Sequence, residues 1–431
     1  MKKLLILPFL GVLYCLAYFV PREKFYLLIS LFAIGFVVME IIKQQRFGLQ
    51  EIFWIGIVCR VICLFSLPML SDDYFRFLWD GAMSMKGISP FAFQPEVYIE
   101  KVSDSVYMNT LYDGMNSKSY FTVYPPLNQL IFYIANLFSG SSILGGVIVI
   151  RLFLLLSEII VFKGLVKILE SLNMDSSLSI YYFLNPLIIM ELFVNLHMES
   201  IMIAGFTWML VFLSKRQYVL AAIHLFLSVN GKLHTLIFIP LLLAFLPIKD
   251  FLKFILVFGF LLVLSFLPLI DVELIHNIKT SLNLYFQSFE FNASLFYVVR
   301  EIGHAILGYD LIKTVGPIFS LISIVAILFI SLRRRVSGIQ DLLNRSFIIF
   351  LIFLLFSSTV HPWYISMALL LGVINQTKSM ILWSFLVMLT YSTYLSDTYI
   401  ENMYLISIEY LGVIAMFIYE INRGRKPFTR V

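Results

Sequence analysis

The sequence predicts an all-α polytopic membrane protein, a bundle of about 12–14 transmembrane helices with short helices in its outer loops. Two observations favour this class. Of the 431 residues, 60% are hydrophobic and 13% are charged, whereas an ordinary soluble domain has roughly 25% charged residues. The hydrophobic residues also fall in long runs, which charged or turn residues separate. Soluble enzymes and disordered chains are therefore excluded, since the first could not bury this apolar surface and the second require low hydrophobicity.

We interpret the segment 1–20 as a retained first span. Two lysines precede an apolar run, as in a signal peptide, but no small-x-small cleavage site follows. Tyr14 directly before Cys15 also disagrees with a lipoprotein signal. We therefore expect this segment to stay in the protein as a helix.

The remaining spans are predicted from the apolar runs that follow. These runs are 26–42, 51–70, 144–168, 176–192, 199–214, 217–232, 233–247, 252–270, 311–332, 343–360, 364–376, 379–395 and 403–421. Several are shorter than the roughly 20 residues that a straight span needs. We expect neighbouring protein or local thinning of the bilayer to cover their ends.

The positive charges predict the orientation. With this set of spans, 19 of the 31 Lys and Arg residues fall on the side of the N-terminus, and the positive-inside rule makes that side cytoplasmic. They are Lys2, Lys3, Lys43, Arg46, Lys163, Lys167, Lys215, Arg216, Lys249, Lys253, Arg333, Arg334, Arg335, Arg345, Lys378, Arg423, Arg425, Lys426 and Arg430. Both termini are thus expected in the cytoplasm. Arg60, Arg151 and Lys232 instead fall inside apolar runs.

Two long segments, 71–143 and 271–310, are left on the outer side, and we expect 1–431 to form a single transmembrane domain. The apolar run 127–139 is too short for a span, and a span there would move Lys163 and Lys167 outside. We predict a re-entrant or surface-lying helix instead.

The sequence shows no pattern typical of a metal or cofactor site. Cys15, Cys59 and Cys63 lie in apolar runs without a CxxC pair or a histidine partner. We interpret them as small buried hydrophobic residues rather than as disulfides or metal ligands. No metal and no cofactor is expected.

Two adjacent carboxylates, Asp72 and Asp73, follow the third predicted span directly, at the outer membrane boundary. If 72–86 is a helix, Ser71 or Asp72 is a natural N-cap, and one helix face holds Asp73, Arg76, Phe77 and Asp80. The ordinary interpretation is a capped surface helix with an Asp73–Arg76 ion pair. The functional interpretation is a general base held at the lipid interface.

Further polar and aromatic residues fall on the same outer face. They are Tyr124, His197, Glu199, Lys232, Asn292, Arg300, His361, Trp363 and Tyr364. Ordinary explanations exist, among them an interface histidine, a snorkelling lysine and an anchoring aromatic belt. The pattern Asn292-Ala-Ser294 is formally a glycosylation acceptor, but such matches are frequent by chance. Ionisable groups at membrane depth are nevertheless costly and are functional candidates by default.

An outer cleft holding a carboxylate, cations and aromatic rings suits the transfer of a sugar from a lipid-linked donor. Asp73 would take the proton from the acceptor hydroxyl as it attacks the anomeric carbon. Arg76, Lys232, Arg300 or His361 would stabilise the departing lipid phosphate, in place of a metal.

The sequence DDYFRFLWDG at 72–81, followed by GISPF at 87–91, resembles the first-loop signature of GT-C superfamily glycosyltransferases. It is most similar to bacterial polyprenol-phosphate-mannose-dependent mannosyltransferases and, more distantly, to the catalytic subunit of GPI mannosyltransferase I. The resemblance extends over about residues 50–376, where further similar blocks are NPL at 185–187, HME at 197–199, Lys232, FNAS at 291–294 and HPWY at 361–364. The chain departs from many members in placing two spans before the span that leads into this loop.

The resemblance implies a GT-C-like bundle in the cell inner membrane and a hexosyltransferase, with mannose as the expected sugar. The family's base stands four residues before an aromatic residue and eight before a small one, a spacing that fits Asp73, Phe77 and Gly81 but not Asp72. It also implies inversion at the anomeric carbon and an active site on the outer, periplasmic face. The partners would be a polyprenyl-phosphate-linked sugar, a glycolipid, polysaccharide or protein acceptor, and membrane lipids, but no nucleic acid.

Two other functions remain open. A flippase or other transporter of lipid-linked oligosaccharides predicts ionisable groups in both leaflets and pseudo-symmetric halves, whereas here the unusual polar groups gather on one face. An O-antigen ligase or polymerase leaves Asp72 and Asp73 unexplained.

Overall fold

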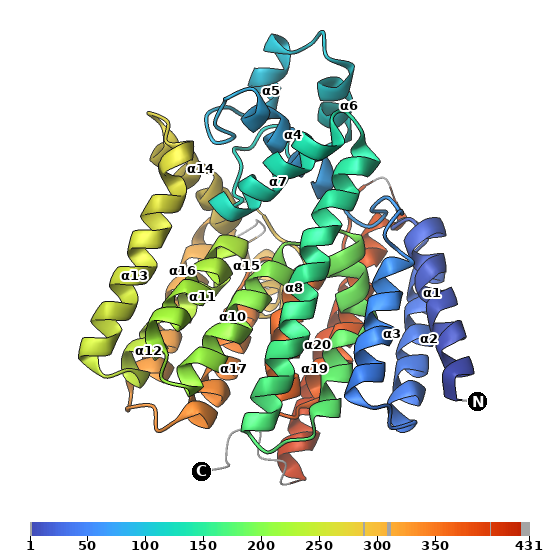
Figure 1. Ribbon diagram of the computed structural model, residues 1–431, viewed down its shortest axis with the longest axis vertical. Helices are drawn as coiled ribbons and strands as arrows, with labels where there is room; N and C mark the ends of the chain where they lie inside the picture. The colour runs from blue at the N-terminus through green and yellow to red at the C-terminus, as the bar shows by residue number, and fades with distance from the viewer. Residues whose placement is uncertain (1, 288, 308–311, 397, 424–431) are drawn as a thin grey trace.

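The computed structural model describes residues 2–287, 289–307, 312–396 and 398–423. Within these ranges the chain is helical, and the one pairing of extended backbone is an isolated bridge between Phe291 and Thr359. Figure 1 shows long helices aligned in a bundle, with a smaller group of helices forming a cap over one end. The predicted all-α polytopic class is confirmed.

Five helices are long and apolar enough to cross a bilayer among the residues that the structure places. They are Phe25–Gln44, Ile143–Ser171, Ile248–Leu269, Thr314–Leu332 and Met403–Asn422. One further span is broken: Ser176–Phe183 and Ile188–Val194 meet at 61°, where Asn185-Pro186 interrupts the helix because proline cannot continue it. Other predicted spans are short apolar helices of 10–17 residues, namely Ile6–Phe19, Glu199–Ser214, Tyr218–Gly231, Leu233–Phe245 and Pro362–Ile374.

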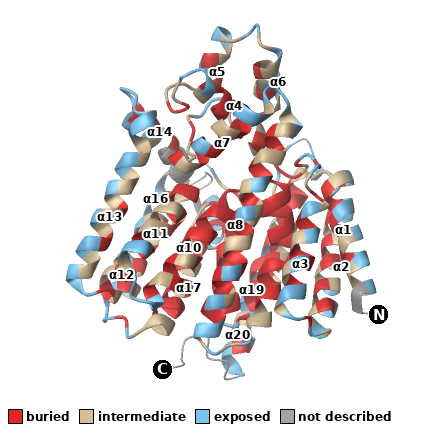
Figure 2. Ribbon diagram, viewed as in Figure 1, coloured by how far each residue is buried: buried red, intermediate tan, exposed pale blue. Residues whose placement is uncertain are grey.

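The bundle follows the predicted order of apolar runs closely. Its helices are α1 (Ile6–Phe19), α2 (Phe25–Gln44), α3 (Leu49–Val61), α8 (Ile143–Ser171), α10 (Glu199–Ser214), α11 (Tyr218–Gly231), α12 (Ile239–Phe245), α13 (Ile248–Phe266), α16 (Ile312–Leu332), α17 (Ile339–Leu355), α18 (Ile365–Ile374), α19 (Lys378–Leu386) and α20 (Met403–Asn422). Figure 2 shows buried residues concentrated along the middle of the bundle, whereas α13 presents many exposed ones. Leu256 and Phe260 on α13 are 70% and 68% exposed, as expected for side chains that face lipid tails.

The cap is formed by α4 (Asp73–Met85), α5 (Pro95–Tyr98), α6 (Val106–Gly114) and α7 (Pro126–Ser139). Helix α7 covers the predicted short helix at 127–139, and it packs in the cap against α4 instead of spanning the bundle. The close approach of α4 and α7 requires a glycine, because a Cβ atom at Gly81 would lie 2.1 Å from the Phe132 carbonyl oxygen.

The second outer segment and the end of the span before it pack against the cap through three hydrogen bonds. Ser89 Oγ donates to the Leu269 carbonyl oxygen, at 3.0 Å. From α14 (Leu274–Gln287), Asn277 donates to the carbonyl of Phe91 and Ser281 donates to that of Phe121, each at 2.9 Å. The chain continues into α15 (Leu295–Leu307). The two outer segments therefore form one layer.

Both arginines that stood out in apolar runs are buried and bind other parts of the bundle. Arg60 donates from Nη2 to Glu158 at 2.8 Å, and both side chains are fully buried. Arg151 donates to the carbonyl oxygens of Cys63, Leu64, Ser66, Phe193 and Val194. These carbonyls lie just after α3 and at the end of the helical turn Ile188–Val194, so Arg151 ties the two chain breaks together.

The cap lies at the end of the bundle opposite the start of α1 and the end of α20 (Figure 1). Lys163 and Lys167 lie in the last turns of α8, away from the cap. Of the basic residues expected at that end, Arg425, Lys426 and Arg430 lie outside the described residues.

Candidate active site

Asp72 and Asp73 lie where the chain enters α4, and their carboxylates have different partners. Asp72 takes the N-cap position without a capping hydrogen bond from its side chain. Its Oδ2 instead pairs with Arg22 Nη2 at 2.7 Å, and the Arg22 guanidinium lies 4.6 Å from the centre of the Tyr394 ring. Burial alone would lower the pKa of Arg22, but the charge and hydrogen bond of Asp72, together with Tyr394 and Tyr399, raise it above its usual value.

Asp73 begins α4 and is partly exposed. Its backbone N–H donates to Ser71 Oγ at 3.3 Å, and its Oδ2 accepts a hydrogen bond from the Tyr124 hydroxyl at 3.2 Å. No ion pair to Asp73 occurs within the described ranges. The positive end of the α4 dipole favours a charged carboxylate here.

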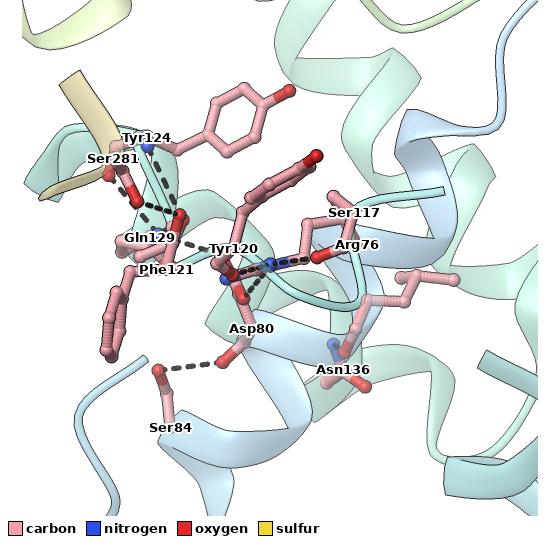
Figure 3. Close-up of polar contacts among 12 residues, drawn as sticks. Arg76, Asp80, Ser84, Ser117, Tyr120, Phe121, Tyr124, Gln129, Asn136 and Ser281 are labelled. Carbon is pink, nitrogen blue, oxygen red and sulfur yellow. Dashed lines mark hydrogen bonds and ion pairs between the residues drawn. The ribbon is translucent and has the colours of Figure 1, made fainter. Parts of the chain in front are cut away.

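Arg76 does not form the ion pair with Asp73 that the sequence allowed. Its Nε donates to Asp80 Oδ1 at 2.7 Å, and its Nη1 donates to the carbonyls of Ser117 and Tyr120 at 3.1 and 2.8 Å (Figure 3). The Arg76 side chain is 4% exposed. These partners give Arg76 a structural role in the cap, and the predicted contact with a lipid phosphate is not supported by its position.

Several predicted residues meet around Lys232, which directly follows the last residue of α11. Lys232 Nζ lies 3.1 Å from Glu199 Oε1. The same ammonium lies 5.8 Å from the centre of the Tyr124 ring and 5.5 Å from that of Tyr364. Tyr124 thus has its hydroxyl on Asp73 and its ring face toward Lys232, so it joins the two charged groups.

His197, Trp363 and His361 form a stack beside this lysine. The Trp363 ring lies 3.6 Å from the His197 ring and 4.4 Å from the His361 ring, with interplanar angles of 17° and 9°. Both faces of Trp363 are therefore covered by imidazoles, which leaves its edge for a ligand. Burial lowers the pKa of His361 well below its usual range, and the positive charge of Lys232 lowers it further, so this imidazole is neutral.

A strained turn sets the orientation of His197. Leu196, just before it, has a φ of 65°, a left-handed conformation that costs a non-glycine residue roughly 1–2 kcal/mol. His197 Nδ1 lies 2.8 Å from the Glu191 carbonyl oxygen, which places the proton on Nδ1. Its Nε2 is buried and has no hydrogen-bond partner within the described part of the chain.

His234 belongs to the same cluster, and the sequence analysis did not select it. Its ring lies 4.8 Å from that of Tyr364, and its buried Nδ1 lacks a hydrogen-bond partner among the residues described. In the sequence, the feature that could have pointed to His234 is its position two residues after Lys232.

Asn292 and Arg300 do not join this cluster. The Asn292 amide is fully buried and donates to Glu409 Oε1 at 3.2 Å, so it is inaccessible to a glycosylating enzyme. Arg300 pairs with Glu290 at 2.7 Å and Glu301 at 2.9 Å. This segment contacts the site through Phe291, because the centre of its ring lies 4.9 Å from that of the His361 ring.

The arrangement combines a carboxylate that can accept a proton with a cation and imidazoles that can bind an anionic, hydroxyl-bearing ligand. Within the described ranges, no group of three His, Cys, Asp or Glu side chains converges as metal ligands do.

Comparison with known proteins gives one match. A family model described as the N-terminal domain of alpha-(1→6)-mannopyranosyltransferases matches residues 22–247, which is more than half of the 431-residue chain. The matched range includes Arg22, Asp73, Tyr124, His197 and Lys232. No curated protein and no solved structure gives a match.

Proposed function

The chain belongs to the alpha-(1→6)-mannopyranosyltransferase family, and we propose that it moves mannose from a polyprenyl-phosphate donor to a hydroxyl acceptor. The observation that carries this proposal is the Asp73–Tyr124–Lys232 arrangement, in which one tyrosine links a carboxylate and an ammonium group. Such a transfer needs a base for the attacking hydroxyl and a positive charge for the leaving phosphate.

Asp73 is proposed as the general base. The acceptor hydroxyl gives its proton to Asp73 while its oxygen forms a bond to the anomeric carbon. The bond from that carbon to the phosphate oxygen breaks, and the phosphate leaves with the electron pair. Attack opposite the leaving group inverts the centre, so a β-linked donor gives an α-mannoside, in agreement with the family's description.

Lys232 is proposed to bind the leaving phosphate, with Glu199 holding its ammonium in place before the donor arrives. His197 has a free lone pair on Nε2 in the tautomer that its Glu191 contact fixes, so it suits a hydroxyl of the sugar. His361 is neutral and acts as a hydrogen-bonding group rather than as a cation. Trp363 and Tyr364 shape the wall of the site. The positive charge of Lys232 takes the part that a metal has in other transferases.

The placement of charges supports an orientation with both termini in the cytoplasm and the cap on the outer, periplasmic face of the inner membrane. The whole chain, 1–431, would then act as one transmembrane glycosyltransferase domain, with 71–143 as the catalytic loop and 271–310 as the second outer loop. The acceptor would be a glycolipid, a polysaccharide or a protein.

A transfer assay tests this proposal. Purified wild type, Asp73→Asn and Asp72→Asn would receive radiolabelled polyprenyl-phosphate-mannose and a membrane lipid extract, with EDTA present. We expect label in the acceptor with wild type and a loss of at least 100-fold with Asp73→Asn, because a positioned general base contributes about 10²–10⁴-fold. Asp72→Asn should keep most of the activity, since Asp72 is engaged by Arg22.

Other outcomes separate the alternatives. Equal transfer by wild type and Asp73→Asn would remove Asp73 from the role of base. Loss in Asp72→Asn alone would move that role to its neighbour. Label that crosses the bilayer without reaching an acceptor would instead indicate a flippase.

A further inference from the structure

We infer that Gln129 is a positioning residue for the transfer reaction, because it holds the backbone of Tyr124 so that the tyrosine hydroxyl meets the base Asp73. This inference rests on the proposed function, since it assigns a role to a contact of the proposed base. Gln129 itself lies on α7 and reaches neither Asp73 nor Lys232.

Tyr124 belongs to a strap, residues 117–124, that crosses the cap without regular secondary structure in its last four residues. Such a segment has no helical or strand ladder to fix its backbone, and each unfixed residue retains conformational freedom of about 1–2 kcal/mol. The position of the Tyr124 hydroxyl therefore depends on what side chains hold the strap.

One amide group holds the end of the strap. Gln129 Nε2 lies 3.2 Å from the Tyr124 carbonyl oxygen, 3.0 Å from Thr122 Oγ1 and 3.1 Å from Asp80 Oδ2 (Figure 3). The Gln129 side chain is buried, with 2% of the residue exposed. All three neighbours present acceptor oxygens, so the position requires a donor and disfavours glutamate.

Asp80 connects this amide to the rest of the strap. Its Oδ2 accepts from Gln129 while its Oδ1 accepts from Arg76, and Arg76 in turn holds the carbonyls of Ser117 and Tyr120. Arg76 and Asp80 share one face of α4 with Asp73 and lie about one and two turns after it, respectively. The helix that carries the base thus also holds the strap that carries its hydrogen-bond partner.

This connection matters for turnover because Tyr124 orients the reacting carboxylate. Its hydroxyl occupies Oδ2 of Asp73 and leaves Oδ1 for the acceptor hydroxyl. A displacement of about 1 Å at such a contact can cost 100-fold in rate. Substrate affinity, by contrast, is set mainly around Lys232, which Gln129 does not contact.

A double-mutant cycle tests the inference. Gln129→Met removes the donor at similar volume, Tyr124→Phe removes the hydroxyl, and the third protein combines both changes. We expect each single variant to lower kcat about tenfold and to leave KM for polyprenyl-phosphate-mannose within about twofold. The double variant should be no slower than the slower single variant, because both changes remove the same contact.

Asn136→Leu is the matched control. Asn136 is a second buried amide on α7, and it also holds α4, by donating to the Leu78 carbonyl at 3.0 Å. Within the described ranges, the hydrogen bonds of its side chain join it to Tyr107, Leu78 and Phe132, and none reaches the strap. We expect this variant to lower the thermal midpoint while kcat stays within twofold.

Three results would overturn the inference: kcat of Gln129→Met within twofold of wild type, losses that multiply in the double variant, or an equal kcat loss in Asn136→Leu. Gln129→Asn, which keeps the amide on a shorter side chain, replaces Gln129→Met if that variant does not fold. Wild-type transfer with loss in Asp73→Asn establishes the proposed function independently, so failure of the cycle then concerns Gln129 alone.

Discussion

Neighbouring carboxylates acquire different chemistry here because the fold gives them different neighbours. Arg22, in the turn between α1 and α2, neutralises Asp72 and is itself held over Tyr394. Within the part of the chain that the structure describes, Asp73 has neutral hydrogen-bonding partners, Ser71 and Tyr124, and no ion pair. Arg22 thus compensates the charge of Asp72 and leaves the proposed base without a competing cation among these residues.

The low pKa of His361 predicts a specific dependence of stability on pH. Above the ordinary value of 6.5 the imidazole is neutral both folded and unfolded, so it contributes nothing. Below pH 6.5, His361 binds a proton in the unfolded chain but stays unprotonated in the folded protein. The free energy of unfolding therefore falls by up to about 1.4 kcal/mol per pH unit as the pH is lowered. His361→Gln should therefore lose less thermal stability than wild type between pH 7 and pH 5.

The measurement is the thermal midpoint of detergent-solubilised protein across this pH range. His276→Gln, at an exposed position on α14, controls for the loss of a histidine elsewhere in the outer segments. Parallel curves for wild type and His361→Gln would contradict the burial of a neutral His361.

Arg76 illustrates what the sequence leaves undecided about single residues. Asp73 lies three residues before it and Asp80 four residues after it, and both spacings allow an ion pair on a helix. Burial decides between them, because Asp80 is fully buried and needs the cation. The cluster of His197, Lys232, His361 and their aromatic neighbours was better predicted, since each residue was unusual for its place in an apolar run.

At the scale of secondary-structure elements, the packing of α4 against α7 positions the site, because α4 provides Asp73 and α7 provides Gln129. The Phe77 ring of α4 stacks on Phe132 of α7 at 4.6 Å and meets Tyr124 edge-on at 4.8 Å. The helix spacing is set where Gly81 faces the backbone of α7.

Gly81→Ala is expected to separate these helices. The added Cβ would lie 2.1 Å from a backbone oxygen and 2.3 Å from Asn136 Nδ2, and a backbone atom cannot rotate away. Overpacking of this kind costs about 1–3 kcal/mol, so the thermal midpoint and the transfer rate should both fall. Gly11→Ala is the matched control, because nothing lies within 4 Å of its Cβ position in α1. An unchanged midpoint in Gly81→Ala would show that α4 and α7 can move apart freely.

Hydrophobic runs predicted most helices, and the broken one is interrupted at Asn185-Pro186, because proline cannot continue a helix. No sequence pattern predicted the π-helical turns of Ile188–Val194 or the left-handed backbone conformation of Leu196. Both features lie beside Arg151, which donates hydrogen bonds to carbonyl oxygens of residues 63–66 and 193–194. The partners of a buried arginine lie far apart in the chain, so a single sequence does not reveal them.

At the scale of the whole molecule, the asymmetry of charge and the position of the cap together predict how the protein is oriented in the membrane. The site lies between the cap and the bundle, at the end opposite the start of α1 (Figure 1). If the positive-inside rule applies, this end faces away from the cytoplasm. A lipid-linked donor would then have to reach the site from the outer leaflet.

Cysteine labelling tests this orientation. Lys101→Cys in the cap and Lys215→Cys after α10 are both at exposed positions, and Cys15→Ser removes the one exposed native thiol. A membrane-impermeant maleimide added to intact cells should label position 101 and spare position 215, and permeabilisation should expose both. Labelling of 215 alone would reverse the topology and place the transfer on the cytoplasmic face. Because the family match is independent of orientation, that result would leave the enzyme class standing while moving its donor and acceptor to the other leaflet.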